Sequence, residues 1–99
     1  MRYQVYVVPQ AWDELKELPG NVRHRVRDVI DSLEANPRQP NSKQLSVTSR
    51  NWELRRVRLE KWRVIYGVND EEQTVDVLAL RKRPPYDYGD LEQLLGELE

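Results

Sequence analysis

The chain of 99 residues has the length of one small domain, and such a domain buries a core too modest to enclose a deep cofactor pocket. Hydrophobic residues make up 38% and charged residues 33%, and the aliphatic residues recur in ordered patterns, which excludes a disordered chain. The absence of cysteine excludes disulfides and thiolate metal ligands. We therefore expect a single folded domain over residues 1–99, with no metal and no cofactor.

The N-terminal segment does not have the features of a targeting signal. Its sequence, MRYQVYVVPQAWDEL, lacks the uninterrupted apolar core of a signal peptide. No stretch of the chain approaches the roughly 20 apolar residues needed to cross a bilayer. We expect a cytoplasmic protein with no membrane partner.

The net charge of −1 conceals an uneven distribution of charge along the chain. Residues 50–66 carry two acids, Glu53 and Glu60, against six bases: Arg50, Arg55, Arg56, Arg58, Lys61 and Arg63. Three further bases occupy positions 81–83, whereas residues 84–99 contain five acids and no base. Because local charge governs binding better than the total does, a basic middle region favours an anionic partner.

The first half of the chain predicts one strand and two helices. Residues 3–8 are rich in aromatic and β-branched residues and predict a short strand that stops at Pro9. Pro9 suits the first position of a helix, which ends at Pro19-Gly20. The apolar side of this helix is expected to comprise Ala11, Trp12, Leu15 and Leu18. Asn21 is expected to cap a second helix that closes at Asn36-Pro37 and buries Val22, Val26, Val29, Ile30 and Leu33.

The second half predicts a loop, three strands and a short helix. Residues 36–50 are polar and contain Pro37 and Pro40, which predicts a loop anchored by Leu45. Strand-like runs over 52–59, 62–68 and 73–80 are separated by short turns and predict an antiparallel meander. Asp90 is expected to cap a terminal helix with one apolar side, formed by Leu91, Leu94, Leu95 and Leu98.

This order of elements, strand, two helices, three strands and a short helix, predicts an α+β fold. Two helices that each bury one apolar stripe must share a face of the sheet. We therefore expect two N-terminal helices packed on one face of a small, mainly antiparallel twisted sheet. The opposite face of that sheet is expected to be open.

Arginines are expected to gather on the open face. Alternation along residues 62–68 points Arg63 away from the apolar set of that strand. The preceding strand alternates less cleanly, and a bulge near Arg55-Arg56 would place several arginines beside Arg63. Guanidinium groups keep their charge and match phosphate oxygens, so the cluster suits a phosphodiester backbone. For the cluster alone, the alternative that these arginines are merely solvated stays open.

The chain resembles the RelE/ParE toxin superfamily, and specifically its RelE branch, over nearly its whole length. The resemblance lies in the layout together with the segments WELRRVRLEKWRVIYGV and VLALRKRPPYDYGDL. The most specific piece is the run Trp62-Arg63-Val64-Ile65-Tyr66, followed after a turn by a hydrophobic strand that ends in basic residues and then tyrosine.

The resemblance implies a toxin that a co-expressed cognate antitoxin neutralises, with which it can form a hetero-oligomer. Toxins of the RelE branch enter the ribosomal A site and cut the bound messenger RNA, which inhibits translation. They are endoribonucleases that need no metal, because the 2′-hydroxyl of the RNA attacks the neighbouring phosphate. The expected partners are therefore the antitoxin, the ribosome and messenger RNA.

The resemblance also assigns site residues. The family's catalytic arginine and basic positions fall on Arg56, Arg63 and Arg83. Its base-stacking tyrosine falls, with a shift of one residue, on Tyr88, and Tyr86 is the alternative. Further expected RNA contacts are Arg55, Arg58, Lys61, Arg81 and Lys82.

One departure from the family pattern concerns proton transfer. Arginine stands at positions 55 and 56, where the pattern often has lysine, and a leucine occupies another position that is often basic. Arginine is a poor proton acceptor, so the base would be Glu53, a tyrosine, the ribosome or water. Two other interpretations stay open. The chain could be a ParE-like, non-enzymatic inhibitor of DNA gyrase, or an inactive relic that only binds its antitoxin.

Overall fold

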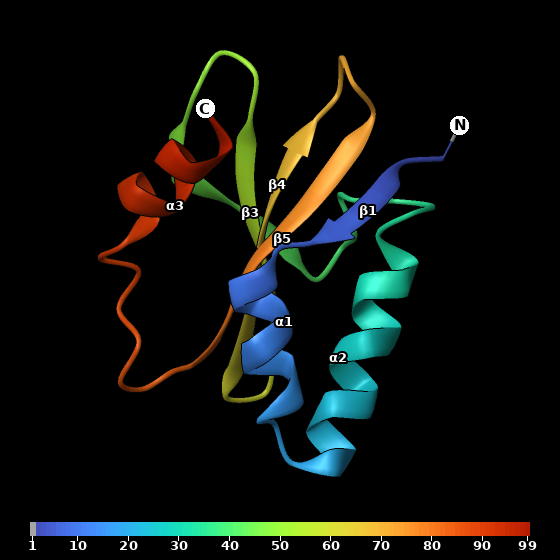
Figure 1. Cartoon of the computed structure of the whole chain (residues 1–99), viewed down its shortest axis with the longest axis vertical. Helices are drawn as coiled ribbons and strands as arrows, with labels where there is room; N and C mark the ends of the chain where they lie inside the picture. Colours follow the sequence, from blue (N-terminus) through green and yellow to red (C-terminus); the bar gives the residue numbers. More distant parts are fainter. Residues whose placement is uncertain (1) are drawn as a thin grey trace.

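The computed structural model describes residues 2–99 and contains one five-stranded sheet and three helices, in the order β1 (Gln4–Val7), α1 (Pro9–Lys16), α2 (Gly20–Ser32), β2 (Ser42–Thr48), β3 (Glu53–Leu59), β4 (Trp62–Asn69), β5 (Thr74–Lys82) and α3 (Leu91–Leu98). The strand order across the sheet is β1-β5-β4-β3-β2 (Figure 1). β1 runs parallel to β5, and the other neighbouring pairs are antiparallel. The predicted α+β fold and its meander are confirmed.

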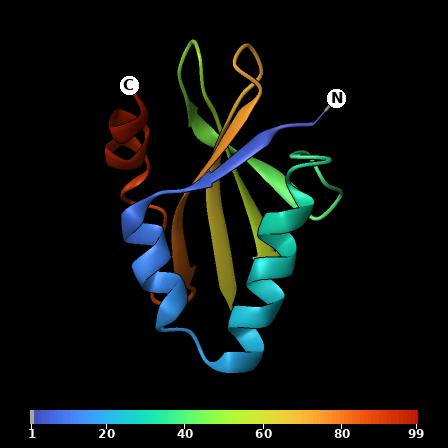
Figure 2. The same cartoon turned by 45° about the vertical axis from the view of Figure 1, so that its right-hand side comes forward.

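Helices α1 and α2 cover one face of the sheet (Figure 2). Their buried residues, with one leucine just after each helix, pack with the sheet in a first apolar cluster that includes Ala11, Leu15, Leu18, Val26, Ile30 and Leu33. Trp12 was expected on this buried side but is 44% exposed. Asn21 does not cap α2 as expected, because the helix already begins at Gly20 and no side chain caps it. Pro9 does occupy the first turn of α1.

The segment predicted to be a loop between residues 36 and 50 contains an additional strand. β2 pairs antiparallel with β3 at the edge of the sheet. Pro37 and Pro40, on which the loop prediction rested, both lie before the strand. Leu45 and Val47 stand two residues apart and pack against apolar residues of the sheet and α3. An edge strand with only two apolar residues carries too weak an alternation to be distinguished from a loop.

The predicted bulge near Arg55 is wrong. β3 and β4 pair without interruption from Glu53, opposite Val68, to Leu59, opposite Trp62. The mixed pattern of β3 arises because both faces of the sheet carry apolar clusters: Val57 packs beneath the helices, and Leu54 packs on the other side. Register shifts occur instead in β2, between Gln44 and Thr48 where it pairs with β3, and between β4 and β5, next to Ile65 and Tyr66.

Helix α3 covers part of the face that was expected to be open. It contributes to a second apolar cluster formed by Leu54, Ile65, Leu78, Ala79, Leu91 and Leu94. Gly67 permits this close packing, because a Cβ there would lie 2.8 Å from Leu98 Cδ1 and 3.0 Å from Trp52 Cε3. α3 therefore leaves only one part of this face free. Within residues 2–99, no helix has both the length and the apolar character of a membrane span.

Tyr66 links the sheet to the segment between α2 and β2. Its side chain is fully buried, and its hydroxyl donates a hydrogen bond of 2.6 Å to the carbonyl of Pro37. Burial raises the pKa of Tyr66, so the phenol is the neutral donor. This bond holds the chain that enters β2 against the core.

Removing this hydroxyl provides a test of the link. We expect Tyr66→Phe to lower the free energy of unfolding by about 1–3 kcal/mol, because the carbonyl of Pro37 loses its donor inside the protein. The same substitution at Tyr6, which is 54% exposed, is the control and should change stability by less than about 0.5 kcal/mol. Urea unfolding followed by tryptophan fluorescence measures both variants. Equal stabilities would show that the Tyr66 hydroxyl contributes nothing.

Candidate nucleic-acid interface

Three arginines lie in one row across three adjacent strands. Arg58 of β3 is the Cα partner of Arg63 in β4, and Arg63 is the partner of Arg81 in β5. Arg58 and Arg63 share the side of their strands with Leu54 and Ile65, which belong to the second apolar cluster, so the row lies on the face that α3 covers in part. Like charges directly opposite one another destabilise a sheet. Other groups must therefore offset the repulsion between neighbouring guanidinium groups.

Arg63 and Arg81 are held by different partners. Arg63 is only 9% exposed, and its Nη1 donates to the backbone carbonyls of Glu60 at 2.8 Å and of Trp62 at 3.0 Å. Arg81 forms ion pairs with Glu14 of α1 and, at 3.4 Å, with Asp90 before α3. Arg63 thus keeps its full charge without an acidic partner, whereas the charge of Arg81 is compensated. Of these two arginines, only Arg63 remains available to an outside anion.

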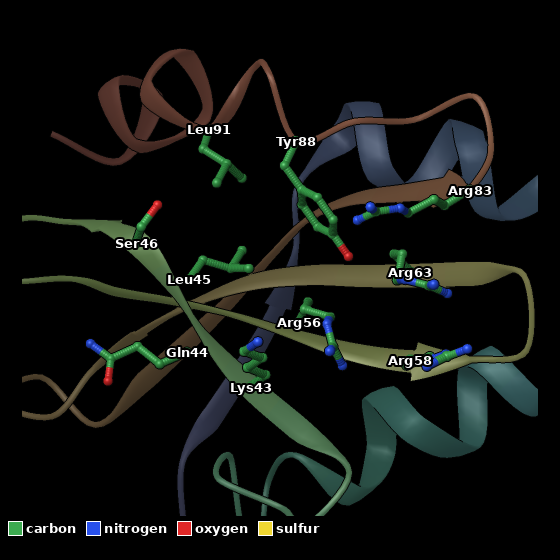
Figure 3. Close-up of a pocket in the computed structure, with 10 residues that line it drawn as sticks. All are labelled: Lys43, Gln44, Leu45, Ser46, Arg56, Arg58, Arg63, Arg83, Tyr88 and Leu91. Atoms are coloured by element: carbon green, nitrogen blue, oxygen red, sulfur yellow. The ribbon is translucent and has the colours of Figure 1, made fainter.

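A pocket adjoins this row on the part of the face that α3 leaves free (Figure 3). It is lined by Lys43, Gln44, Leu45, Ser46, Arg56, Arg58, Arg63, Arg83, Tyr88 and Leu91. Five of these ten residues are basic, and none is acidic or histidine. Within the described chain, Lys43, Arg56, Arg58 and Arg83 form no ion pair. The pocket is therefore a concentrated, uncompensated positive site.

The segment between β5 and α3 brings Arg83 and Tyr88 to the pocket. The guanidinium carbon of Arg83 lies 5.0 Å from the centroid of the Tyr88 ring, within cation–π range. Tyr88 also meets Tyr86 edge to face, with centroids 4.9 Å apart. The Tyr86 hydroxyl donates a hydrogen bond to Asp90. The pKa of Tyr86 is raised, mainly because the ring is partly buried and also because of this hydrogen bond. Asp90 thus binds both Arg81 and Tyr86 rather than capping α3 through its side chain.

The structure separates the predicted site residues into two groups. Arg56, Arg58, Arg63, Arg83 and Tyr88 come together in the pocket. The remaining predicted contacts do not line it: Arg55, Lys61, Arg81, Lys82 and Tyr86. Lys61 and Lys82 are exposed beyond the row, whereas Arg81 and Tyr86 are occupied by Asp90.

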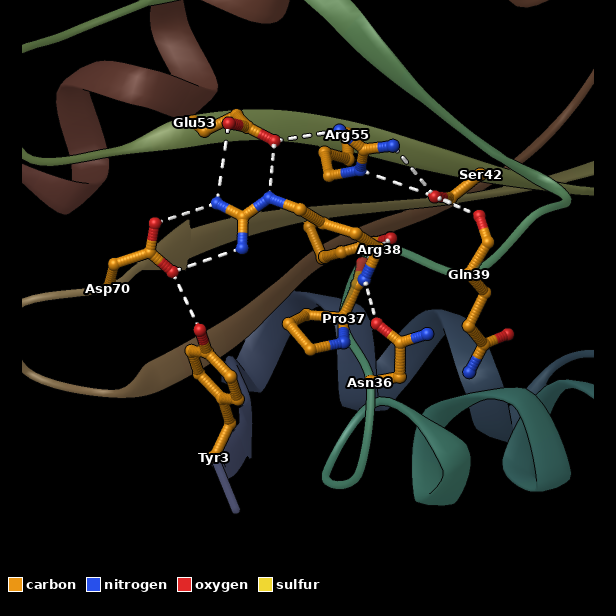
Figure 4. Close-up of polar contacts among 10 residues, drawn as sticks. Tyr3, Asn36, Pro37, Arg38, Gln39, Ser42, Glu53, Arg55 and Asp70 are labelled. Carbon is orange, nitrogen blue, oxygen red and sulfur yellow. Dashed lines mark hydrogen bonds and ion pairs between the residues drawn. The ribbon is translucent and has the colours of Figure 1, made fainter. Parts of the chain in front are cut away.

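Arg55 and Glu53 lie on the opposite side of β3 from the pocket, in a separate polar network (Figure 4). Arg55 Nη1 lies 2.7 Å from Glu53 Oε2, and the Arg55 guanidinium also donates to Ser42 Oγ at 2.9 Å. Arg38 joins Glu53 to Asp70, and its bonds hold the pKa of the Asp70 carboxyl below the usual value. Glu53, expected as a candidate base, is therefore remote from the arginine row.

Lys43 is the basic pocket residue that the sequence analysis did not identify. It lies on β2 as the Cα partner of Arg56, is exposed, and lines the pocket. Because residues 42–48 were predicted to be a loop, nothing fixed the direction of this side chain. Once residues 42–48 are known to form a strand, Lys43 shares a side of it with Leu45 and Val47, but that pattern alone was too weak to predict the strand. Among residues 2–99, no group of acidic or histidine side chains is arranged to hold a metal ion.

Comparison with known proteins gives a family match over most of the chain. Residues 5–84 match the family model described as the ParE toxin of the type II toxin-antitoxin system parDE. No match to an individual curated protein was found.

Solved structures with the same fold include three toxins of the RelE type. The archaeal RelE–RelB complex from Pyrococcus horikoshii is 31% identical, with a TM-score of 0.75 over 87% of this chain and 100% of the other. The RelBE2 complex from Mycobacterium tuberculosis is 24% identical, with a TM-score of 0.69 over 84% and 100%. The isolated RelE toxin from E. coli is 19% identical, with a TM-score of 0.66 over 98% and 99%. The last two likenesses concern the fold alone.

The contacts of Asp90 predict that it orders the segment carrying Tyr88. Asp90→Asn weakens the links to Arg81 and Tyr86, so amide hydrogen exchange in residues 83–90 should become faster while the thermal midpoint changes little. Glu92→Gln, at an exposed position of α3, is the matched control and should leave the exchange unchanged. Unchanged exchange in Asp90→Asn would remove the ordering role.

Proposed function

The chain belongs to the RelE/ParE toxin superfamily of type II toxin-antitoxin systems, and from this membership we propose that it is a ribosome-dependent endoribonuclease that cuts messenger RNA in the A site. In this role it inhibits translation, and a cognate antitoxin neutralises it. The observation that carries the proposal is the pocket with five basic residues and no acid. A compact group of uncompensated cations facing one cavity suits a phosphodiester far better than a neutral or cationic ligand.

The proposed reaction is an attack by the RNA on itself. The 2′-oxygen bonds to the adjacent phosphorus, and the bond from phosphorus to the 5′-oxygen breaks. The protein must align these atoms and stabilise the extra negative charge on the phosphorane. Arg56, Arg63 and Arg83 are the proposed stabilising residues. Arg63 suits this role because its bonds to the turn carbonyls fix its guanidinium before substrate arrives.

Tyr88 is the proposed stacking residue for an RNA base. Its ring lines the pocket beside Arg83, whereas the hydroxyl of Tyr86 is engaged by Asp90. Stacking of an unpaired base on an aromatic ring contributes about 1–3 kcal/mol to binding. Arg58 lies at the open end of the row and supplies a further contact to the RNA backbone. We assign no direct RNA contact to Arg55 or Arg81, since acids already bind both.

The proposed antitoxin lays an amphipathic segment over the toxin, with acidic side chains near the pocket. Such a partner covers apolar surface and neutralises the cations at the same time. Solved relatives of the RelE type are complexes with RelB, which supports an antitoxin of this general kind.

A ParE-like action on DNA gyrase is the second candidate, because the matching family model describes ParE toxins. This alternative requires binding only. A positive pocket that contains neither carboxylate nor imidazole is compatible with it, since these are the commonest general bases. The two candidates differ in their cellular products, which are cut messenger RNA in one case and broken DNA in the other.

Single truncations in the pocket test the proposal. We expect Arg56→Ala and Arg83→Ala to abolish growth arrest and to lower the cleavage rate about 100- to 1000-fold, because one preorganised charge at the phosphorane is lost. Both side chains lack ion-pair partners within the described residues, so thermal stability should be retained, and the apolar contacts of the antitoxin should keep its binding largely intact. Arg63→Ala is a less clean test, because it also removes the donor to two turn carbonyls. Arg50→Ala, outside the pocket, is the matched control.

The measurement is primer extension on messenger RNA from cells that express each variant. Cuts in register with codons, dependent on translation and lost in both variants, are the expected result. Growth arrest with DNA breaks and no such cuts would favour the gyrase inhibitor instead. Wild type that binds the antitoxin but causes neither effect would identify an inactive relic.

A further inference from the structure

We propose that Lys43 is the proton acceptor of the RNA-cutting reaction, taking the proton from the attacking 2′-hydroxyl. This inference rests on the proposed function and identifies a residue that the assignment of arginines leaves out. It begins from the composition of the pocket. Arginine holds its proton at any accessible pH, so four of the five basic lining residues cannot accept one.

Among the side chains of this protein, position or chemistry disfavours the other candidate bases. Glu53 is bound to Arg38 and Arg55 on the far side of the sheet. Asp90 is bound to Arg81 and Tyr86 and does not line the pocket. Of the ten lining residues, only Lys43 and Tyr88 belong to residue types that commonly act as general bases in proteins. The ring of Tyr88 lies against the guanidinium of Arg83, and its proposed role is to stack on a base.

The surroundings of Lys43 favour this role. Its strand partner is Arg56, and in Figure 3 its side chain lies beside Arg56 in the pocket. The other charged or titratable groups that face the pocket are Arg58 from β3, Arg63 from β4, and Arg83 and Tyr88 from the segment after β5, whereas α3 contributes only Leu91. Lys43 makes no ion pair with any described residue. Lys43 is thus the one lysine among four arginines at the pocket, with no acid beside it.

The complete step balances without a metal or another reactant. The bond from the 2′-oxygen to phosphorus forms, and the 2′-proton moves to Nζ of Lys43. The bond from phosphorus to the 5′-oxygen breaks, and water protonates the departing 5′-oxygen. The products are a cyclic phosphate and a free 5′-hydroxyl, and Lys43 then returns its proton to water.

Lys43→Arg provides the sharpest test, because it keeps the positive charge but replaces the amine with a guanidinium, which cannot act as a proton acceptor. With programmed ribosomes, single-turnover cleavage should slow by about 100-fold or more, while affinity for ribosomes carrying a 2′-O-methyl substrate changes less than about threefold. The rising alkaline limb of the wild-type rate profile should disappear. In Lys43→Ala, small primary amines should restore cleavage in order of their basicity. Lys16→Arg, on the exposed surface of α1, is the matched control and should behave as wild type.

The possible results separate the two proposals. Wild type that cuts messenger RNA, together with a Lys43→Arg variant of unchanged rate and pH profile, would overturn the role of Lys43 and leave the nuclease intact. A variant with weakened RNA binding but an unchanged maximal rate would show that Lys43 is only an anion contact, and would also overturn the inference. Wild type that never cuts RNA would overturn both proposals. Thermal melting and antitoxin binding establish that each variant is folded.

Discussion

The central constraint in this protein is the repulsion among arginines that stand side by side on a sheet. Arg58, Arg63 and Arg81 occupy one row, where adjacent like charges are unfavourable. Glu14 and Asp90 compensate Arg81, backbone carbonyls of the β3–β4 turn hold Arg63, and Arg58 extends into solvent. Acidic partners thus neutralise the charge at the Arg81 end of the row, whereas Arg58 and Arg63 have no acidic partner among the described residues. These two arginines line the pocket.

The same contacts connect the fold to the site. Asp90, which compensates Arg81, also binds Tyr86, and the ring of Tyr86 meets that of Tyr88. Asp90 therefore reduces the repulsion within the arginine row and also helps to position Tyr88 at the pocket. On the other side, β2 adds Lys43 opposite Arg56. The apolar cluster beneath α3 holds the two segments on either side of the pocket, because it includes Leu91 at the start of α3 and packs against Leu45 of β2.

The sequence predicts the main architecture because its strong patterns are local. The apolar spacing of residues 22–33 predicted α2, and the runs after residue 52 predicted the meander. The direction of Arg63 followed from alternation in β4. Three features depend on contacts distant in sequence and were missed: the pairing of β2, the second apolar cluster, and the capture of Arg81 by Glu14. The false bulge arose from assuming one buried face, and the unrecognised strand concealed Lys43.

The most direct test is to observe which arginines respond to RNA. A short RNA with a 2′-O-methyl group at the cut site binds without reacting, and Nε resonances report each guanidinium in a 15N-labelled protein. Titration with this RNA should shift the signals of Arg56, Arg58, Arg63 and Arg83 and leave those of Arg55 and Arg81 nearly unchanged. The affinity for the RNA should fall steeply with added salt. Shifts at Arg55 and Arg81, with the pocket arginines unaffected, would contradict the assignment of this pocket as the RNA site.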